Sequence, residues 1–109
     1  MRTDVEVCRE IAAHVEDGVM QDAVILLASI DRLALDPAAH DETQEKPRLR
    51  VDLKGEDGNA YFLIAKAIHS LMKIRREASA CGLLCVYTPP EHYADLVELM
   101  RYYVTLETE

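Results

Sequence analysis

The sequence predicts an α+β domain, in which an N-terminal helical hairpin is followed by a small sheet packed with two helices. Apolar residues recur at helical spacing in the first 35 residues, alternate with polar residues over 49–53, and return to helical spacing from residue 60. At 109 residues the chain is long enough for one domain with its own core. We therefore expect a single domain (1–109) made of an acidic helical hairpin (1–35), a mobile acidic loop (36–47) and a strand–helix–strand–helix–strand unit (48–109).

The first helix is predicted to begin at Thr3 and to end near Val15. Residues 3–6 fit a capping box, in which the Thr3 hydroxyl and the Glu6 carboxylate each bind an orphan backbone amide. Asp17 and Gly18 then supply a turn that tolerates positive φ. One side of this helix is apolar and carries Val5, Cys8, Ile11, Ala12 and Val15.

The second helix is predicted over residues 20–35 and is apolar on most sides. One neighbouring helix cannot cover that much apolar surface, so part of it is expected to lie in a subunit interface. We therefore predict a homodimer with Leu26 and Ile30 at the interface. Residues 36–47 then combine two prolines with several acidic residues and no bulky apolar residue, which predicts the loop.

The second part of the chain is predicted to form the sheet. Residues 49–53 alternate as a half-buried strand, and a helix with apolar residues at i, i+3, i+4 and i+7 begins at Asn59 or Ala60. The apolar run 82–88 precedes two prolines and is interpreted as a strand. A helix over 90–101 and a strand over 102–106 follow, with the terminal strand pairing with 49–53. The inward face of the helix from Asn59 is expected to cover the sheet through Ile64, Ile68 and Leu71.

The corner between the first strand and that helix has two interpretations. The favoured one is a turn at Asp57 and Gly58, with Asp57 or Asn59 capping the helix, because no phosphate-loop pattern is present. The alternative is a small-ligand or anion site, or an unrecognised enzyme site, that uses backbone amides at the helix start. Its residues would be Gly55, Asp57, Gly58 and Asn59.

The same corner carries a resemblance. LRVDLKGEDGNAYFLIAKAIHSLMK (49–73) and HYADLVELMRYYVTLE (92–107) resemble a group of short bacterial and phage proteins. In that group a strand, a G-x-DGNAF-like turn and a helix are followed by further helical segments and a short closing strand. This chain departs from the pattern in having Tyr61 before Phe62. Since the group has no assigned enzymatic activity, the resemblance implies a small accessory protein of a phage or mobile element, such as an inhibitor of a host defence system.

The formal net charge of −8 is unevenly distributed. Residues 1–45 carry eleven acidic and three basic side chains, whereas residues 46–109 carry nine of each. An acidic half repels phosphates, so non-specific nucleic-acid binding is not expected. The helix after residue 59 has a basic polar side that offers local contacts to a protein partner of unknown identity, through Lys66, His69, Lys73 and Arg76.

The cysteines and histidines do not specify a reaction. Cys81, Cys85 and His92 would form a three-ligand metal set only in a helical segment, because on a strand the two cysteines lie about 13 Å apart. We therefore expect no metal, no cofactor and no catalytic residue. The favoured function is a non-enzymatic interaction protein whose acidic half steers a partner.

Cysteine number and hydropathy bear on location. The three cysteines are an odd number, which favours reduced thiols, and the longest apolar run, Ala23–Ala28, is too short to span a bilayer. A soluble cytoplasmic protein without a membrane segment is expected.

Overall fold

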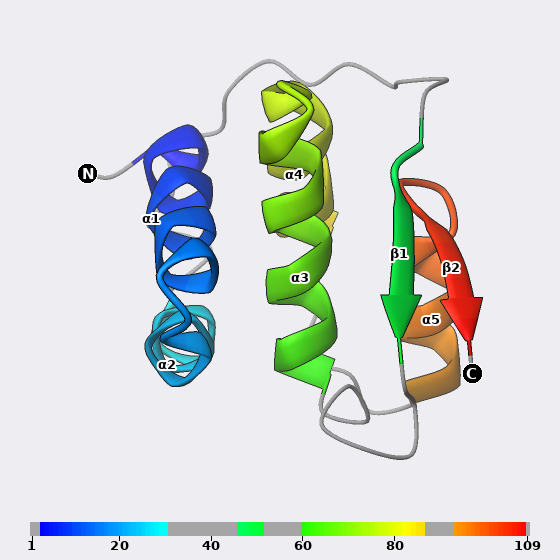
Figure 1. Ribbon diagram of the computed structural model, residues 1–109, viewed down its shortest axis with the longest axis horizontal. Coiled ribbons are helices and arrows are strands. Elements are labelled where there is room, and N and C mark those ends of the chain that lie inside the picture. The colour runs from blue at the N-terminus through cyan, green and yellow to red at the C-terminus, as the bar shows by residue number, and fades with distance from the viewer. Residues whose placement is uncertain (1–2, 31–45, 52–59, 87–92, 109) are drawn as a thin grey trace.

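The computed structural model describes residues 3–30, 46–51, 60–86 and 93–108. These residues form a mostly helical fold with a two-stranded parallel sheet, so the α+β class is confirmed. The order of elements is α1 (Asp4–Glu16), α2 (Met20–Ser29), β1 (Arg48–Val51), α3 (Ala60–Lys73), α4 (Glu77–Val86), α5 (Tyr93–Met100) and β2 (Thr105–Thr108) (Figure 1).

Helix α3 is the centre of the fold. Figure 1 shows it between α1 on one side and the sheet on the other, and it contacts α1, α2, α4, α5 and β1. The predicted helical spacing from Ala60 is confirmed, because its inward positions are buried. Alanines between the large side chains let neighbouring helices approach closely, and the buried set is Leu63, Ile64, Ala65, Ala67, Ile68 and Leu71.

The start of α1 is formed by the Thr3 side of the predicted capping box, and the predicted bond from the Glu6 carboxylate stays a prediction. The Thr3 backbone is extended, and its Oγ1 accepts a hydrogen bond from the Glu6 amide at 3.2 Å. The helix then buries Val7, Cys8 and Ile11 against the core. A local sequence signal therefore located this helix terminus, because the cap depends only on residues within one turn.

Helix α2 is shorter than predicted. It ends at Ser29, where the hydroxyl donates to the Leu26 carbonyl at 3.0 Å, and the backbone of Ile30 is extended. Such a side-chain bond competes with the helical ladder. Residues 31–45 lie outside the described residues, so of the predicted loop (36–47) the structure describes only Lys46 and Pro47. Figure 1 shows α2 almost end-on below α1, and the pairing of the two as a hairpin stays a prediction.

The sheet pairs the two predicted regions of the chain. β1 and β2 are parallel, with Arg48 opposite Thr105 and Val51 opposite Thr108. Within β1 the predicted alternation is confirmed, since Leu49 and Val51 are buried and the residues before them are exposed. Leu53 lies outside the described residues.

The terminal strand begins three residues later than predicted. Residues 102–104 form turns at the end of α5, where the amides of Tyr103 and Val104 both donate to the Met100 carbonyl at 2.9 Å. The aromatic and β-branched composition of 102–106 was therefore a poor guide to the strand boundary. These hydrogen bonds at the end of α5 hold residues 102–104 in turns, so the strand begins only at Thr105.

The prediction of a strand over 82–88 is wrong, because residues 77–86 form α4. Three helices, α3, α4 and α5, therefore lie between the two strands in the chain, instead of the two helices and one strand that the sequence predicted. Periodicity failed because this helix is buried on several sides: Ser79, Ala80, Cys81, Leu83 and Leu84 are all buried. A short run that is apolar at every position has the same sequence pattern in a buried helix as in a buried strand.

Gly82 in α4 offers a stabilising substitution. A Cβ at this position would meet the Tyr103 ring at 3.4 Å, which is ordinary van der Waals contact. Because glycine inside a helix costs about 0.5–1 kcal/mol relative to alanine, Gly82→Ala should raise the free energy of unfolding by about that amount. Urea unfolding measures it. The opposite exchange at the buried neighbour, Ala80→Gly, should lower stability, and a destabilised Gly82→Ala would show that the Tyr103 contact is too tight.

Candidate functional site

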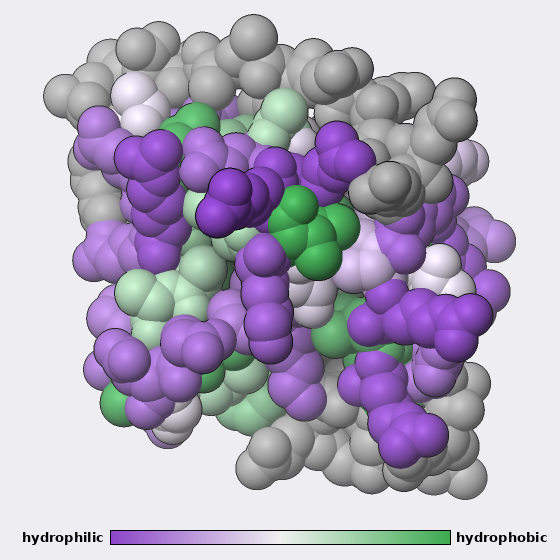
Figure 2. Space-filling view, turned by 45° about the horizontal axis from the view of Figure 1, so that its top comes forward, coloured by the Kyte–Doolittle hydropathy of each residue, from purple (hydrophilic) through white to green (hydrophobic). Residues whose placement is uncertain are grey.

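A shallow concave surface lies between α1 and α3. The two helices lie side by side and run in opposite directions (Figure 1). Between them is an open groove of about 330 Å³ lined by Ala12, Ala13, Glu16, His69, Met72 and Lys73. The space-filling view shows a largely hydrophilic surface on which hydrophobic residues gather in small separate areas (Figure 2).

The spacing of these residues along each helix places them on facing sides. Residues 12 and 16 are four apart on α1, and residues 69 and 73 are four apart on α3, so each pair occupies one helical face. The two alanines leave the floor of the groove shallow and apolar, together with Met72. Charged and polar side chains from both helices form its rim.

A hydrogen-bonded pair joins α1 to α3 beside the groove. His69 Nε2 lies 2.6 Å from Glu16 Oε2, and the side chains are 22% and 67% exposed. The hydrogen bond to His69, the charge of protonated His69 and the nearby Lys73 hold the pKa of Glu16 below its ordinary value of 4.5. Glu16 is therefore an ionised acceptor at neutral pH, and it fixes the orientation of the imidazole.

This pair predicts an acid-sensitive contribution to stability. Because the pKa of Glu16 is lower in the folded than in the unfolded protein, the contribution is present above pH 4.5 and is lost as the pH falls through the folded-state pKa. Glu16→Gln should flatten this part of the stability profile, measured by urea unfolding between about pH 3 and 6. Glu98→Gln, at an exposed site on α5, should keep the wild-type slope. An unchanged slope in Glu16→Gln would contradict the pair.

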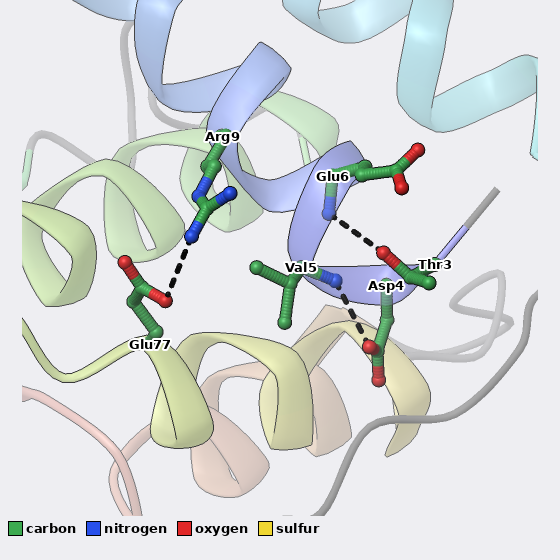
Figure 3. A network of polar contacts seen from close by, with 6 residues as sticks. All are labelled: Thr3, Asp4, Val5, Glu6, Arg9 and Glu77. Atoms are coloured by element: carbon green, nitrogen blue, oxygen red, sulfur yellow. Dashed lines mark hydrogen bonds and ion pairs between the residues drawn. The ribbon is translucent and has the colours of Figure 1, made fainter.

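A second set of polar contacts lies near the start of α1 (Figure 3). Arg9 Nη2 is 3.4 Å from Glu77 Oε2 and joins α1 to α4, but both side chains are exposed, so the pair contributes less than about 1 kcal/mol. Asp4 is different, because its side chain is fully buried and Oδ1 accepts the Val5 amide at 2.9 Å. Of these contacts, the Arg9–Glu77 pair joins two helices and the others stabilise the start of α1.

The groove contains two of the side chains singled out as partner contacts, His69 and Lys73. Lys66 is half-buried on α3 and does not line the groove, and Arg76 is half-buried beyond a turn in which Arg75 has a φ of 62°. The groove residues that sequence reasoning did not identify are Ala12, Ala13, Glu16 and Met72. Their participation depends on which helices are neighbours, for which the sequence carried no signal.

The interface predicted on α2 stays a prediction, and the structure gives the exposure of its residues in the single chain. Leu26 and Ile30 are half-buried and pack against the core. The exposed apolar side chain of α2 is Ile25, at 57%. The alternative ligand site at Gly55, Asp57, Gly58 and Asn59 lies outside the described residues and stays a prediction.

The helical course of α4 also changes the argument about cysteine ligands. Cys81 and Cys85 are one helical turn apart, so the separation of about 13 Å expected on a strand does not apply. Cys81 is fully buried, as is Cys8 on α1, and neither forms a disulfide. Within the ranges that the structure covers, no three His, Cys, Asp or Glu residues are grouped to hold a metal ion.

Comparison with known proteins supplies no relative: no family model matches the sequence, and no curated protein or solved structure matches it. No helix in the described part of the chain is both long and apolar enough to cross a membrane.

Proposed function

We propose that this protein is a non-enzymatic interaction protein that binds a helix of a partner protein in the groove between α1 and α3. The observation that carries the proposal is the groove itself, with an apolar floor of Ala12, Ala13 and Met72 and a rim formed by Glu16, His69 and Lys73. An apolar floor with a polar rim is the usual composition of a surface that receives an amphipathic helix.

Opposite charges on the two sides of the groove support a specific orientation of that helix. Residues 3–30 carry six acidic side chains and one basic one, whereas residues 60–86 carry four basic side chains and one acidic one. A partner helix with basic residues towards α1 and acidic residues towards α3 would match both sides. Its central apolar side chain would enter the space that the two alanines leave open.

The test fills the groove without disturbing the core. Ala13 is exposed, so Ala13→Trp should fold normally and occupy the groove. Ala28→Trp is the matched control, since Ala28 is exposed on α2 and does not line the groove. Tagged proteins are incubated with lysate of the source organism, and bound proteins are compared by quantitative mass spectrometry. A partner should bind wild type and Ala28→Trp and be depleted at least about tenfold by Ala13→Trp, equivalent to about 1.4 kcal/mol. Equal recovery on all three proteins would reject the groove.

We further propose that the chain forms a homodimer through α2, with Ile25 at the interface in addition to the predicted Leu26 and Ile30. The support is the 57% exposure of Ile25 on a helix whose other large apolar side chains are half-buried or buried. Light scattering at micromolar concentration should give twice the mass of the 12.3 kDa chain, and Ile25→Glu should halve it. A monomeric wild type would reject this proposal.

The resemblance to short bacterial and phage proteins suggests where such an interaction protein acts. We propose a cytoplasmic accessory factor of a phage or mobile element, such as an inhibitor of a host defence system. The uneven charge supports this, because an acidic helical half can steer towards a basic partner surface. Expression in a host carrying a defined defence system should restore plaque formation by a sensitive phage, and Ala13→Trp should abolish that effect.

A further inference from the structure

The two-stranded sheet lies on the opposite side of α3 from α1 (Figure 1), and its exposed face carries basic side chains. Leu49 and Val51 point into the core, so Arg48 and Arg50 occupy the exposed face of β1, and the Arg48 side chain is 83% exposed. We call this surface the sheet-face cluster, and it consists of Lys46, Arg48, Arg50, Arg101 and Tyr102.

Two hydrogen bonds bring the chain after α5 to the beginning of β1. Lys46 Nζ donates to the Arg101 carbonyl at 3.0 Å, and the Thr105 amide donates to the Pro47 carbonyl at 2.9 Å. Tyr102 follows directly and is 74% exposed. Tyrosine and arginine are the residue types enriched in the energetically dominant part of protein interfaces.

We propose that the sheet-face cluster binds an extended acidic segment of a partner protein. Arg48 and Arg50 are two residues apart on one strand, which separates them by about 7 Å, the spacing of alternate side chains in an extended peptide. A guanidinium has five N–H donors and can bind a carboxylate through two parallel hydrogen bonds, so two acidic side chains at i and i+2 would bind in addition to, or in exchange for, the interactions that Arg48 and Arg50 already make within the fold. Tyr102 supplies apolar contact at one end of the cluster.

The charge of the whole molecule favours a protein segment over a nucleic acid. The net charge of −8, concentrated in residues 1–45, repels a long polyanion. A short acidic segment experiences mainly the local field, because charges beyond about 8 Å are screened at physiological salt. Glu107 lies on the same face with its Oε1 3.7 Å from Arg48 Nε, and it partly neutralises the cluster.

The test uses the full chain and a fluorescein-labelled peptide of alternating Glu and Thr, with anisotropy measured at low and physiological salt. The double substitution Arg48→Gln and Arg50→Gln should weaken binding at least about tenfold, and Tyr102→Ala should weaken it several-fold. Glu107→Gln should tighten binding, because it removes the competing carboxylate. Arg9→Gln is the matched control on α1, remote from the sheet, and should leave the affinity unchanged. Circular dichroism confirms that each variant is folded.

Several results would overturn the proposal. Absence of peptide binding at low salt is one, and equal weakening by Arg9→Gln is another, since it would show a general charge effect. Tighter binding of an oligothymidylate of equal charge would identify a nucleic acid as the occupant. A wild-type dimer dissociated by the double arginine substitution would mean that a second copy of this chain occupies the surface. Loss of peptide binding in Ala13→Trp, a folded variant in the groove between α1 and α3, would place the peptide in the groove and also overturn the proposal.

Discussion

Replacing Ile68 with alanine is expected to lower the free energy of unfolding by about 3–4 kcal/mol. Ile68 is fully buried on α3, which contacts four other helices or strands in addition to α1. The surrounding elements already hold one another in place, so they cannot collapse into the space that the removed carbons leave. Since small domains are stable by about 5–15 kcal/mol, this single change removes a large part of the total.

Urea unfolding of wild type and variant at one pH measures this effect. Ile74→Ala is the matched control, because Ile74 is 41% exposed just after the same helix. It should cost less than about 1 kcal/mol. A loss below about 1 kcal/mol in Ile68→Ala would contradict the central position of α3.

Replacing Asp4 with alanine is expected to cost about 2–3 kcal/mol. Its carboxylate is fully buried, accepts the Val5 amide, and makes a further interaction within the fold. In Figure 3 the side chain extends from the start of α1 towards α4. Alanine would leave the partners of the carboxylate buried without hydrogen bonds, and it would remove a negative charge from the positive end of the helix dipole.

Two substitutions separate these effects. Asp4→Asn keeps a hydrogen-bond acceptor but removes the charge, so it should cost about half as much. Glu6→Ala changes an exposed acidic residue of the same helical turn and should cost only a few tenths of a kcal/mol. If Asp4→Ala and Glu6→Ala were equally mild, burial of the Asp4 carboxylate would have no energetic consequence.

Local patterns were sufficient for the elements whose form depends on their own residues. Thr3 capped α1 as predicted, and helical spacing located α3, because one face of it must be buried. The alternation of Leu49 and Val51 located β1 for the same reason. Where burial surrounds a segment, as it does around Cys81 and Leu84 in α4, the pattern carries no information about helix or strand.

The candidate groove was only half visible in the sequence. His69 and Lys73 belong to a polar stripe on a predicted helix, so they were identified as exposed contacts. Glu16 and the two alanines of α1 lie beside them only through a tertiary contact. Glu16 and His69 are 53 positions apart, so the periodicity of neither helix predicts that they meet. Ile25 was missed for a related reason, because which side of an apolar helix stays exposed depends on the elements packed around it.

The parallel sheet has a consequence for the order of folding. Lys46 and Arg101, which meet at its start, are 55 residues apart in the chain, and α3, α4 and α5 lie between them. Closing a loop of that length costs roughly 3–4 kcal/mol of entropy before any strand hydrogen bond forms. Contacts among the intervening helices join residues that are closer in sequence, so they cost less loop-closure entropy and form earlier. Strand pairing is therefore expected after the rate-limiting step, so substitutions in β2 should speed unfolding while leaving the refolding rate almost unchanged.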